Sequence, residues 1–262
     1  MDLGLRGRTA LITGGSKGIG FGVAKSLAAE GCDLRLASRS AETLAEAADA
    51  IAKAHQVRVE THAVDISRSE SVEELVAAGP LPDILVNNAG AIPGGDLQAV
   101  DEATWRQAWD LKVFGYINMT RRFYGLMKQR GHGVICNVTG LAADKTDFNY
   151  IAGTTGNAGL NAFTRALGGQ SVEDGVRVFA VSPGPVQTER LIGLLKTRCR
   201  QETGSDEGWR DYMSAMPMAR AAKVEEVADV VAFLVSGRAS YVSGTVLTVD
   251  GGFGSRGGSF SR

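Results

Sequence analysis

Short apolar runs alternate along the chain with longer segments in which apolar residues recur at helical spacing. The runs are too short for helices, and several are rich in Val, Ile and Leu, which favours β-strands. Seven segments fit this description: 10–12, 33–37, 57–63, 84–86, 133–138, 176–182 and 245–249. Several of them are continuously apolar, which is typical of strands buried on both faces. The pattern predicts an α/β fold with a doubly wound, mainly parallel seven-stranded (Rossmann-like) sheet.

Helices are expected between these strands. After the helix that follows the first strand, the expected helices are a segment capped by Ser40, one from about 69 to the prolines at 80 and 82, 102–129, 150–172 and 225–235. Segment 187–218 is mixed, polar and methionine-containing, and we expect it to form a lid over a substrate pocket. No linker interrupts the pattern, so the chain is interpreted as a single domain over 1–262 with a Gly/Ser-rich tail at 251–262.

Composition narrows the function classes. The chain has 262 residues, 44% of them hydrophobic and 22% charged, and a net charge of −1, which gives no reason to expect nucleic acid or membrane as a partner. Its cysteines are Cys32, Cys136 and Cys199, and they lack the paired spacing of a zinc site or a disulfide framework, so no metal is expected. No signal peptide or bilayer-length apolar run is visible, and a cytoplasmic location is expected.

A glycine-rich turn follows the first strand. Gly14, Gly18 and Gly20 lie between apolar Ala10–Ile12 and an apolar, alanine-containing helical run. Strand, glycine turn and helix together aim backbone N–H groups and the positive end of a helix at a phosphate. Three glycines can equally mark an ordinary loop, so the rest of the chain must decide between these readings.

Further motifs decide in favour of a dinucleotide site. The turn Thr13–Gly20 resembles the T-G-x-x-x-G-x-G fingerprint of the short-chain dehydrogenase/reductase family, Asn87–Gly90 resembles its N-N-A-G motif, and 183–188 resembles its P-G-x-V-x-T loop. The closing segments 217–220, 226–228, 243–244 and 249–252 also match. The resemblance implies an oxidoreductase that uses a nicotinamide cofactor on a small-molecule substrate. It also implies a homotetramer or homodimer.

The choice of cofactor depends on charge at the end of the second strand. An acidic residue there would accept hydrogen bonds from the ribose of NAD, whereas this chain has Ser38 and Arg39. The guanidinium of Arg39 suits a phosphate, and Lys17 in the glycine turn adds a second cation. These residues favour NADP(H), although each cation alone could be an exposed surface side chain.

The resemblance assigns the remaining cofactor contacts residue by residue. Asp65 would contact the adenine amino group, unless it caps a helix; Asn87, Ala89 and Gly90 would line the ribose; Val186 and Thr188 would touch the nicotinamide carboxamide. The full set of expected cofactor-binding residues is Gly14, Ser16, Lys17, Gly18, Ile19, Gly20, Ser38, Arg39, Asp65, Ile66, Asn87, Ala89, Gly90, Tyr150, Thr154, Pro183, Gly184, Val186 and Thr188.

The catalytic pattern of the family is altered. The family uses a tyrosine as general acid/base, a lysine four residues later that lowers the phenol pKa, a serine and an asparagine. Counting along the motifs places Tyr150 at the tyrosine, Thr154 at the lysine and Lys112 at the asparagine. The serine position falls at Gly140, with Thr139 beside it.

We expect Lys112 to supply the ammonium missing at Thr154, with Tyr150 as the general acid/base and Thr139 standing in for the serine hydroxyl. The alternative is that Lys112 buries its stem and keeps its charge at the surface, in an active site that has decayed. The expected function is therefore NADP(H)-dependent interconversion of a ketone and a secondary alcohol. The alternatives are an NADP-binding sensor or scaffold without turnover, and a reaction such as enoyl reduction or dehydration.

Overall fold

A computed structural model describes residues 1–256 and confirms the predicted α/β fold. All seven strands form one parallel sheet in the order β3-β2-β1-β4-β5-β6-β7. The strands are β1 (Thr9–Thr13), β2 (Asp33–Ser38), β3 (Val59–Ala63), β4 (Ile84–Asn87), β5 (Gly133–Val138), β6 (Val176–Pro183) and β7 (Val246–Val249). Each predicted strand therefore exists, with ends that differ by at most two residues.

The strand order reverses between β1 and β4, which are neighbours in the sheet. Loops after β1 and after β4 leave in opposite directions at such a reversal, and a crevice opens at the carboxyl edge between them. The register aligns Ile12 of β1 with Val86 of β4, and Asn87 with Asn137 of β5. The glycine turn, the Asn87–Gly90 segment and the residues after β5 therefore meet at one edge.

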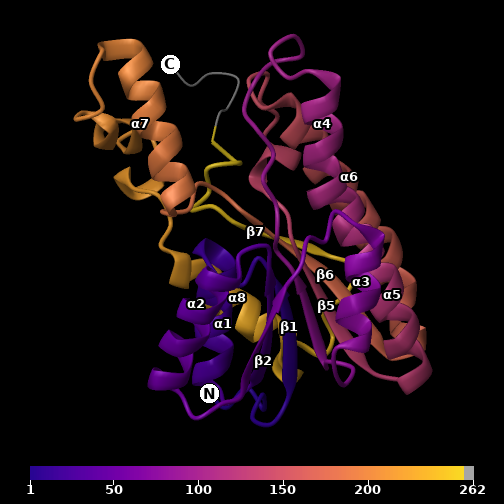
Figure 1. Cartoon of the computed structure of the whole chain (residues 1–262). Coiled ribbons are helices and arrows are strands. Elements are labelled where there is room, and N and C mark those ends of the chain that lie inside the picture. Colours follow the sequence, from indigo (N-terminus) through magenta and orange to yellow (C-terminus); the bar gives the residue numbers. More distant parts are fainter. Residues whose placement is uncertain (257–262) are drawn as a thin grey trace.

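Helices cover both faces of the sheet (Figure 1). One apolar core lies under α1 (Gly18–Ala29), α2 (Ala41–Ala54) and α8 (Val224–Val235). The other lies under α3 (Ser69–Ala77) and α5 (Gly115–Arg130), with α6 (Ile151–Gln170) on the same side. Ser40 accepts a hydrogen bond from the Thr43 amide at the start of α2, as its predicted capping role requires. In the described chain no helix is both long enough and apolar enough to span a bilayer.

The long helix predicted over 102–129 consists of three parts. It begins as α4 (Glu102–Trp109), widens into a π-helical turn η1 (Asp110–Phe114) and continues as α5 (Gly115–Arg130). Such single π turns are frequent at functional sites. Lys112 lies at the centre of this turn, which a 3.6-residue pattern could not reveal.

The helix predicted from Tyr150 begins one residue later, as α6 (Ile151–Gln170), and is followed by the 3-10 turn η3 (Ser171–Asp174). Tyr150 has a non-helical backbone, with φ −141° and ψ 39°. Its side chain therefore does not follow the direction that a residue inside α6 would take.

The predicted lid is helical. It contains α7 (Glu189–Thr203), which stands away from the sheet in Figure 1, and the turn η4 (Trp209–Met213). The two pack around their own small core of Leu195, Cys199 and Trp209. Three other short 3-10 turns are η2 (Leu141–Ala143), η5 (Pro217–Ala219) and η6 (Gly237–Ala239). Of the predicted Gly/Ser-rich tail, residues 257–262 lie outside the described residues.

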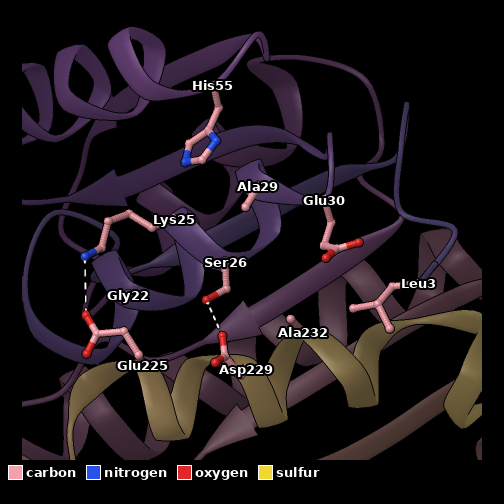
Figure 2. Close-up of a pocket in the computed structure, with 10 residues that line it drawn as sticks. All are labelled: Leu3, Gly22, Lys25, Ser26, Ala29, Glu30, His55, Glu225, Asp229 and Ala232. Carbon is pink, nitrogen blue, oxygen red and sulfur yellow. Dashed lines mark hydrogen bonds and ion pairs between the residues drawn. The ribbon is translucent and has the colours of Figure 1, made fainter. Parts of the chain in front are cut away.

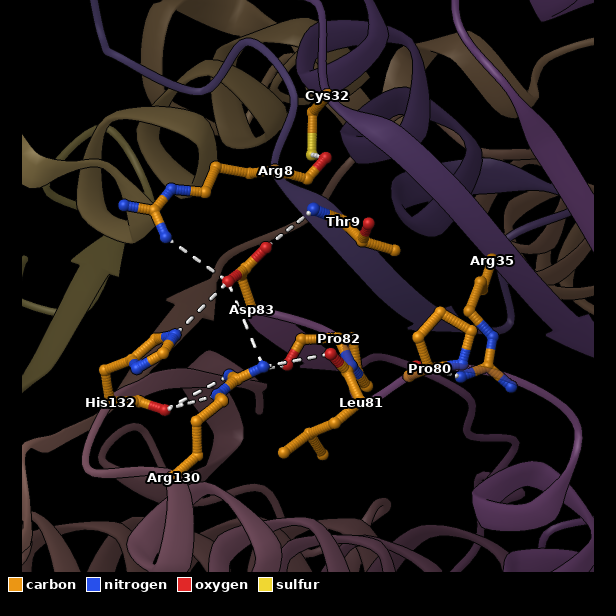
Figure 3. Close-up of polar contacts among 10 residues, drawn as sticks. All are labelled: Arg8, Thr9, Cys32, Arg35, Pro80, Leu81, Pro82, Asp83, Arg130 and His132. Atoms are coloured by element: carbon orange, nitrogen blue, oxygen red, sulfur yellow. Dashed lines mark hydrogen bonds and ion pairs between the residues drawn. The ribbon is translucent and has the colours of Figure 1, made fainter.

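A charged cluster closes the amino edge of the sheet, opposite the crevice (Figure 3). The carboxylate of Asp83, just before β4, accepts hydrogen bonds from Arg8 Nη1 at 3.2 Å and from the Thr9 amide at 3.0 Å. Arg130 donates to the carbonyls of Leu81 and Pro82, both at 2.9 Å. These contacts join β1, β4 and the end of α5 at the edge away from the predicted site.

Candidate active site

The backbone of the glycine turn is too crowded for side chains at its glycines. A Cβ on Gly20 would lie 2.3 Å from the carbonyl oxygen of Gly14 and 2.4 Å from Nδ2 of Asn88. Gly14 and Gly18 have φ values of +65° and +54°, which glycine adopts without strain. Glycine at these three positions therefore lets the turn fold tightly onto the start of α1.

Asn88 fastens this turn to the end of β4. Its Nδ2 donates to the carbonyls of Thr13 at 3.1 Å and Gly14 at 3.2 Å. The hydroxyl of Thr13 accepts in return from the amides of Asn88 and Ala89. Asn88 was not among the expected site residues, although two consecutive asparagines after a buried strand indicated a polar site there.

The N-terminus of α1 is available to an anion. Its N-cap residue, Lys17, makes no side-chain capping hydrogen bond, and the first turn contains no acidic residue. The lysine side chain is exposed at the mouth of the turn. Unpaired N–H groups, the helix dipole and this cation fit the pyrophosphate of a dinucleotide.

Three hydroxyl groups gather beside Arg39 at the end of β2. Ser16 Oγ donates to Ser38 Oγ at 3.2 Å, and Thr43 Oγ1 donates to Ser16 Oγ at 3.2 Å. Arg39 is exposed, and among the described residues it takes part in no ion pair. Thr43 was not among the expected site residues, because its position on α2 gave no sign that it would contact the glycine turn.

The predicted contact between the Asn87 side chain and the ribose does not fit the structure. It is fully buried, and its Nδ2 donates to Thr120 Oγ1 at 3.0 Å and Asn137 Oδ1 at 2.9 Å. Its side chain therefore belongs to a polar network inside the sheet and does not line the ribose. Asp65 is partly accessible and accepts from the amide and hydroxyl of Ser67, so it stabilises the turn before α3 rather than acting as the N-cap.

The loop after β6 reaches the glycine turn. A Cβ on Gly18 would lie 3.4 Å from Thr188 Cγ2, in ordinary contact. Thr188 is the N-cap of α7 and accepts from the Leu191 amide. Val186 is buried and forms a short bridge with Ala222. The lid therefore begins at the point where the phosphate turn and the 183–188 loop meet.

Lys112 points into the crevice. Its ammonium donates to the carbonyl of Thr139 at 3.1 Å, and its stem covers Gly90. Burial, together with the positive charge of Arg190, lowers the pKa of Lys112 to about 8. The alternative of a surface-headed lysine is therefore wrong, because the charged end lies inside against a backbone oxygen.

The expected role of the Thr139 hydroxyl is not supported. Thr139 is only 5% exposed, and its Oγ1 lies 3.5 Å from the carbonyl of Val181 on β6. The hydroxyl is thus in reach of the backbone of β6. It is the Thr139 carbonyl that contacts Lys112.

Tyr150 lies directly over Gly153. A Cβ on Gly153 would come within 2.0 Å of the Tyr150 Cζ atom, so the phenol ring fills the space of the missing side chain. Tyr150 also packs against the apolar cluster of Ile92, Ala108 and Ala152. Burial raises the pKa of Tyr150, and the nearby guanidinium of Arg190 opposes that rise. The phenol is therefore protonated around neutral pH and can donate a proton.

Thr154 and Asn157, both on α6, contact different segments of the chain. Thr154 Oγ1 accepts from the Asp147 amide at 3.3 Å, which directs it to the loop before the helix. Asn157 is buried beside Gly140, where a Cβ would lie 3.3 Å from its Nδ2. Its Nδ2 donates to the Gly153 carbonyl at 2.8 Å, and its Oδ1 has no hydrogen-bond partner within residues 1–256. Asn157 was missed by the sequence analysis, and its burial beside Gly140 identifies it.

A separate groove lies between α1 and α8 (Figure 2). Two polar pairs bridge it: Lys25 forms an ion pair with Glu225 at 3.5 Å, and the Ser26 hydroxyl donates to Asp229 at 2.9 Å. None of the expected site residues lines it. The groove is therefore distinct from the crevice.

Known proteins resemble this chain over almost its whole length. Residues 14–254 match a family model described as enoyl-(acyl carrier protein) reductase. The chain is 36% identical to galactitol 2-dehydrogenase (L-tagatose-forming) of Cereibacter sphaeroides, over 95% of this chain and 96% of that one. It is 29% identical to a 3-oxoacyl-[acyl-carrier-protein] reductase of Chlamydia muridarum, over 94% and 96%.

Among solved structures, the chain resembles L-sorbose reductase from Gluconobacter frateurii complexed with NADPH and L-sorbose. The TM-score is 0.89 at 31% sequence identity, and the match covers 96% of this chain and 98% of that chain. Another similar structure, with a TM-score of 0.81 and 37% identity, is described as a short chain dehydrogenase/reductase family protein. The sequence motifs, the sheet order and these matches agree: the chain belongs to the short-chain dehydrogenase/reductase family of oxidoreductases.

Proposed function

We propose that this protein is an NADP(H)-dependent oxidoreductase that interconverts a ketone and a secondary alcohol. Tyr150 would be the general acid/base and Lys112 the assisting cation. The observation that carries the proposal is that Lys112 and the half-buried Tyr150 lie against the same segment after β4. The stem of Lys112 covers Gly90 while its ammonium donates to the Thr139 carbonyl, and Tyr150 packs in one cluster with Ile92. This segment follows the carboxyl end of β4, at the edge of the sheet where the glycine turn also lies.

The chemical steps divide between cofactor and chain. When bound, the nicotinamide would supply a hydride to the carbonyl carbon. Tyr150 would donate its phenolic proton to the ketone oxygen, which becomes the alcohol oxygen, and would regain a proton from solvent. Lys112 would stabilise the phenolate left on Tyr150, because an ammonium nearby favours the charged form.

Specificity for NADP(H) would come from Arg39 and the hydroxyl groups of Ser16, Ser38 and Thr43. We expect Arg39→Glu to weaken NADPH binding by about 10- to 100-fold, the effect of losing a charge-assisted hydrogen bond. NADH binding should change little or improve, because a carboxylate can accept from a ribose hydroxyl. Both affinities are measured by titration of cofactor fluorescence. Lys53→Glu, an exposed charge reversal in α2, is the control, and equal losses in both variants would contradict the assignment.

Lys112→Met should lower turnover by about 100-fold, as expected for removal of a preorganised charge from an active site. The pKa of about 8 also predicts a pH effect: the ammonium is present below that value and is lost as pH rises through it. The wild type should therefore lose reductase activity above about pH 8. Lys112→Met should lose this limb of the profile, as measured by steady-state kinetics. A wild-type limb that persists in the variant would show that another group causes it.

The function itself is tested by following NADPH oxidation with a panel of ketoses, other ketones, quinones, acyl thioesters and enoyl thioesters. Two similar proteins are named for sugars or sugar alcohols, which makes ketoses the first substrates to try. Carbonyl turnover supports the proposal. Enoyl turnover alone would favour double-bond reduction, and NADPH binding without any turnover would favour a sensor or scaffold.

A further inference from the structure

Arg190 at the start of the lid is the second cation of the crevice. It is the second residue of α7, and its guanidinium donates to the Gly90 carbonyl at 3.3 Å and to the Ile92 carbonyl at 2.5 Å. Two of its five N–H groups are thus used, and among the described residues no carboxylate pairs with it. The arginine fastens the lid to the segment that follows β4.

The same segment carries the other reactive groups. The stem of Lys112 covers Gly90, and the phenol ring of Tyr150 packs in one apolar cluster with Ile92. Gly95, farther along, pairs with Tyr150 through a short bridge, and its amide donates to the Asn149 carbonyl at 2.6 Å. Arg190 and Tyr150 are therefore held against the same segment and meet at Ile92: Arg190 binds its carbonyl, and Tyr150 packs in the apolar cluster that contains its side chain.

We propose that Arg190 is a lid-borne positioning residue, which places a permanent positive charge beside Tyr150 when α7 is docked on Gly90 and Ile92. The inference rests on the proposed function, since it assigns Tyr150 a partner in the same reaction. Three charged side chains belong to elements near Tyr150. Arg190 of α7 is the one whose charge acts on the pKa of the phenol, whereas Lys112 of η1 donates to the Thr139 carbonyl and Asp147, in the loop before α6, accepts from the Asn149 amide. Of these, Arg190 is the cation whose position depends on the lid.

The consequence is that lid docking and proton transfer are coupled. A nearby guanidinium favours the phenolate, and this opposes the burial that raises the pKa of Tyr150. When α7 moves away, the phenol loses this stabilisation and becomes a weaker acid. A docked lid would thus both cover the substrate and prepare the proton donor.

The test compares three variants: Arg190→Met, Arg190→Lys and the control Arg198→Met. Arg198 lies on the same helix, where its exposed side chain pairs with Glu202 at 2.8 Å. The protein is labelled at tyrosine Cζ, and the Tyr150 resonance is assigned by its loss in Tyr150→Phe. We expect its titration midpoint to rise by about one pH unit in Arg190→Met, the lower end of the range for a neighbouring charge. Arg190→Lys should restore part of the difference, and Arg198→Met should match the wild type.

A Tyr150 midpoint that is unchanged in Arg190→Met, or that Arg198→Met moves equally, overturns the inference. A purely structural latch would give the first of these results even if turnover fell. The titration does not require catalysis, so it separates two failures. Wild-type protein with no carbonyl turnover but an Arg190-dependent Tyr150 titration would refute the proposed function and leave the inference standing.

Discussion

Tyr150→Phe is expected to lose ketone reduction by about 100- to 10,000-fold, the usual contribution of a positioned general acid. Phenylalanine keeps the ring that covers Gly153 and packs on Ile92, so the fold and the crevice should be preserved. Only the proton that would go to the ketone oxygen is removed. The loss should appear in kcat, whereas NADPH affinity, measured by fluorescence titration, should stay within about 10-fold of the wild type.

Tyr241→Phe is the matched control for this substitution. Tyr241 is fully exposed, and the same loss of one hydroxyl there should leave turnover unchanged. Full activity in Tyr150→Phe would instead mean that another group donates the proton.

Gly153→Ala should be nearly as damaging, although it favours the helix. Alanine is better than glycine inside a helix by about 1 kcal/mol, so thermal stability should not fall far. Its Cβ, however, would lie 2.0 Å from Tyr150 Cζ, and the phenol ring would have to leave its place. A reacting group displaced by about 1 Å can cost about 100-fold in rate, and we expect a loss of that size.

Gly159→Ala on the same helix provides the comparison. No atom lies within 4 Å of a Cβ at that exposed position, so this variant should gain helix stability and keep full activity. Steady-state kinetics and thermal melts of the two alanine variants are measured together. If Gly153→Ala is as active as Gly159→Ala, the ring of Tyr150 has no catalytic position to lose.

The fold was predictable because its signals are local. Apolar runs such as 84–86, which are too short for a helix, indicate strands buried on both faces, and the glycine turn marks where the first helix begins. The π turn around Lys112 was not predictable, because one extra residue in a helix leaves the apolar spacing almost unchanged. The start of α6 was missed by one residue, which decides the direction of the Tyr150 side chain.

The candidate site was predictable only in part. Residues within motifs, such as Gly20 and Thr188, are fixed by short-range geometry at the ends of strands. Arg190 and Asn157 were missed because their contacts are made between different elements of the fold. Arg190 binds Ile92, 98 positions away in the sequence, and Asn157 of α6 lies against Gly140 in the loop after β5. The contact of the Thr139 hydroxyl with the Val181 carbonyl was not predictable, because it depends on how β5 and β6 pair, which sequence spacing alone does not give.

Transfer of deuterium from the nicotinamide C4 of labelled NADPH to a ketone is the measurement that bears most directly on the proposed reaction. The ketoses and other ketones of the substrate panel are incubated with wild-type protein, and the products are analysed by mass spectrometry and NMR. We predict a secondary alcohol with deuterium on the former carbonyl carbon, and strongly reduced product with Tyr150→Phe. Tight NADPH binding with no deuterium on the carbonyl carbon of any ketone would contradict the proposal.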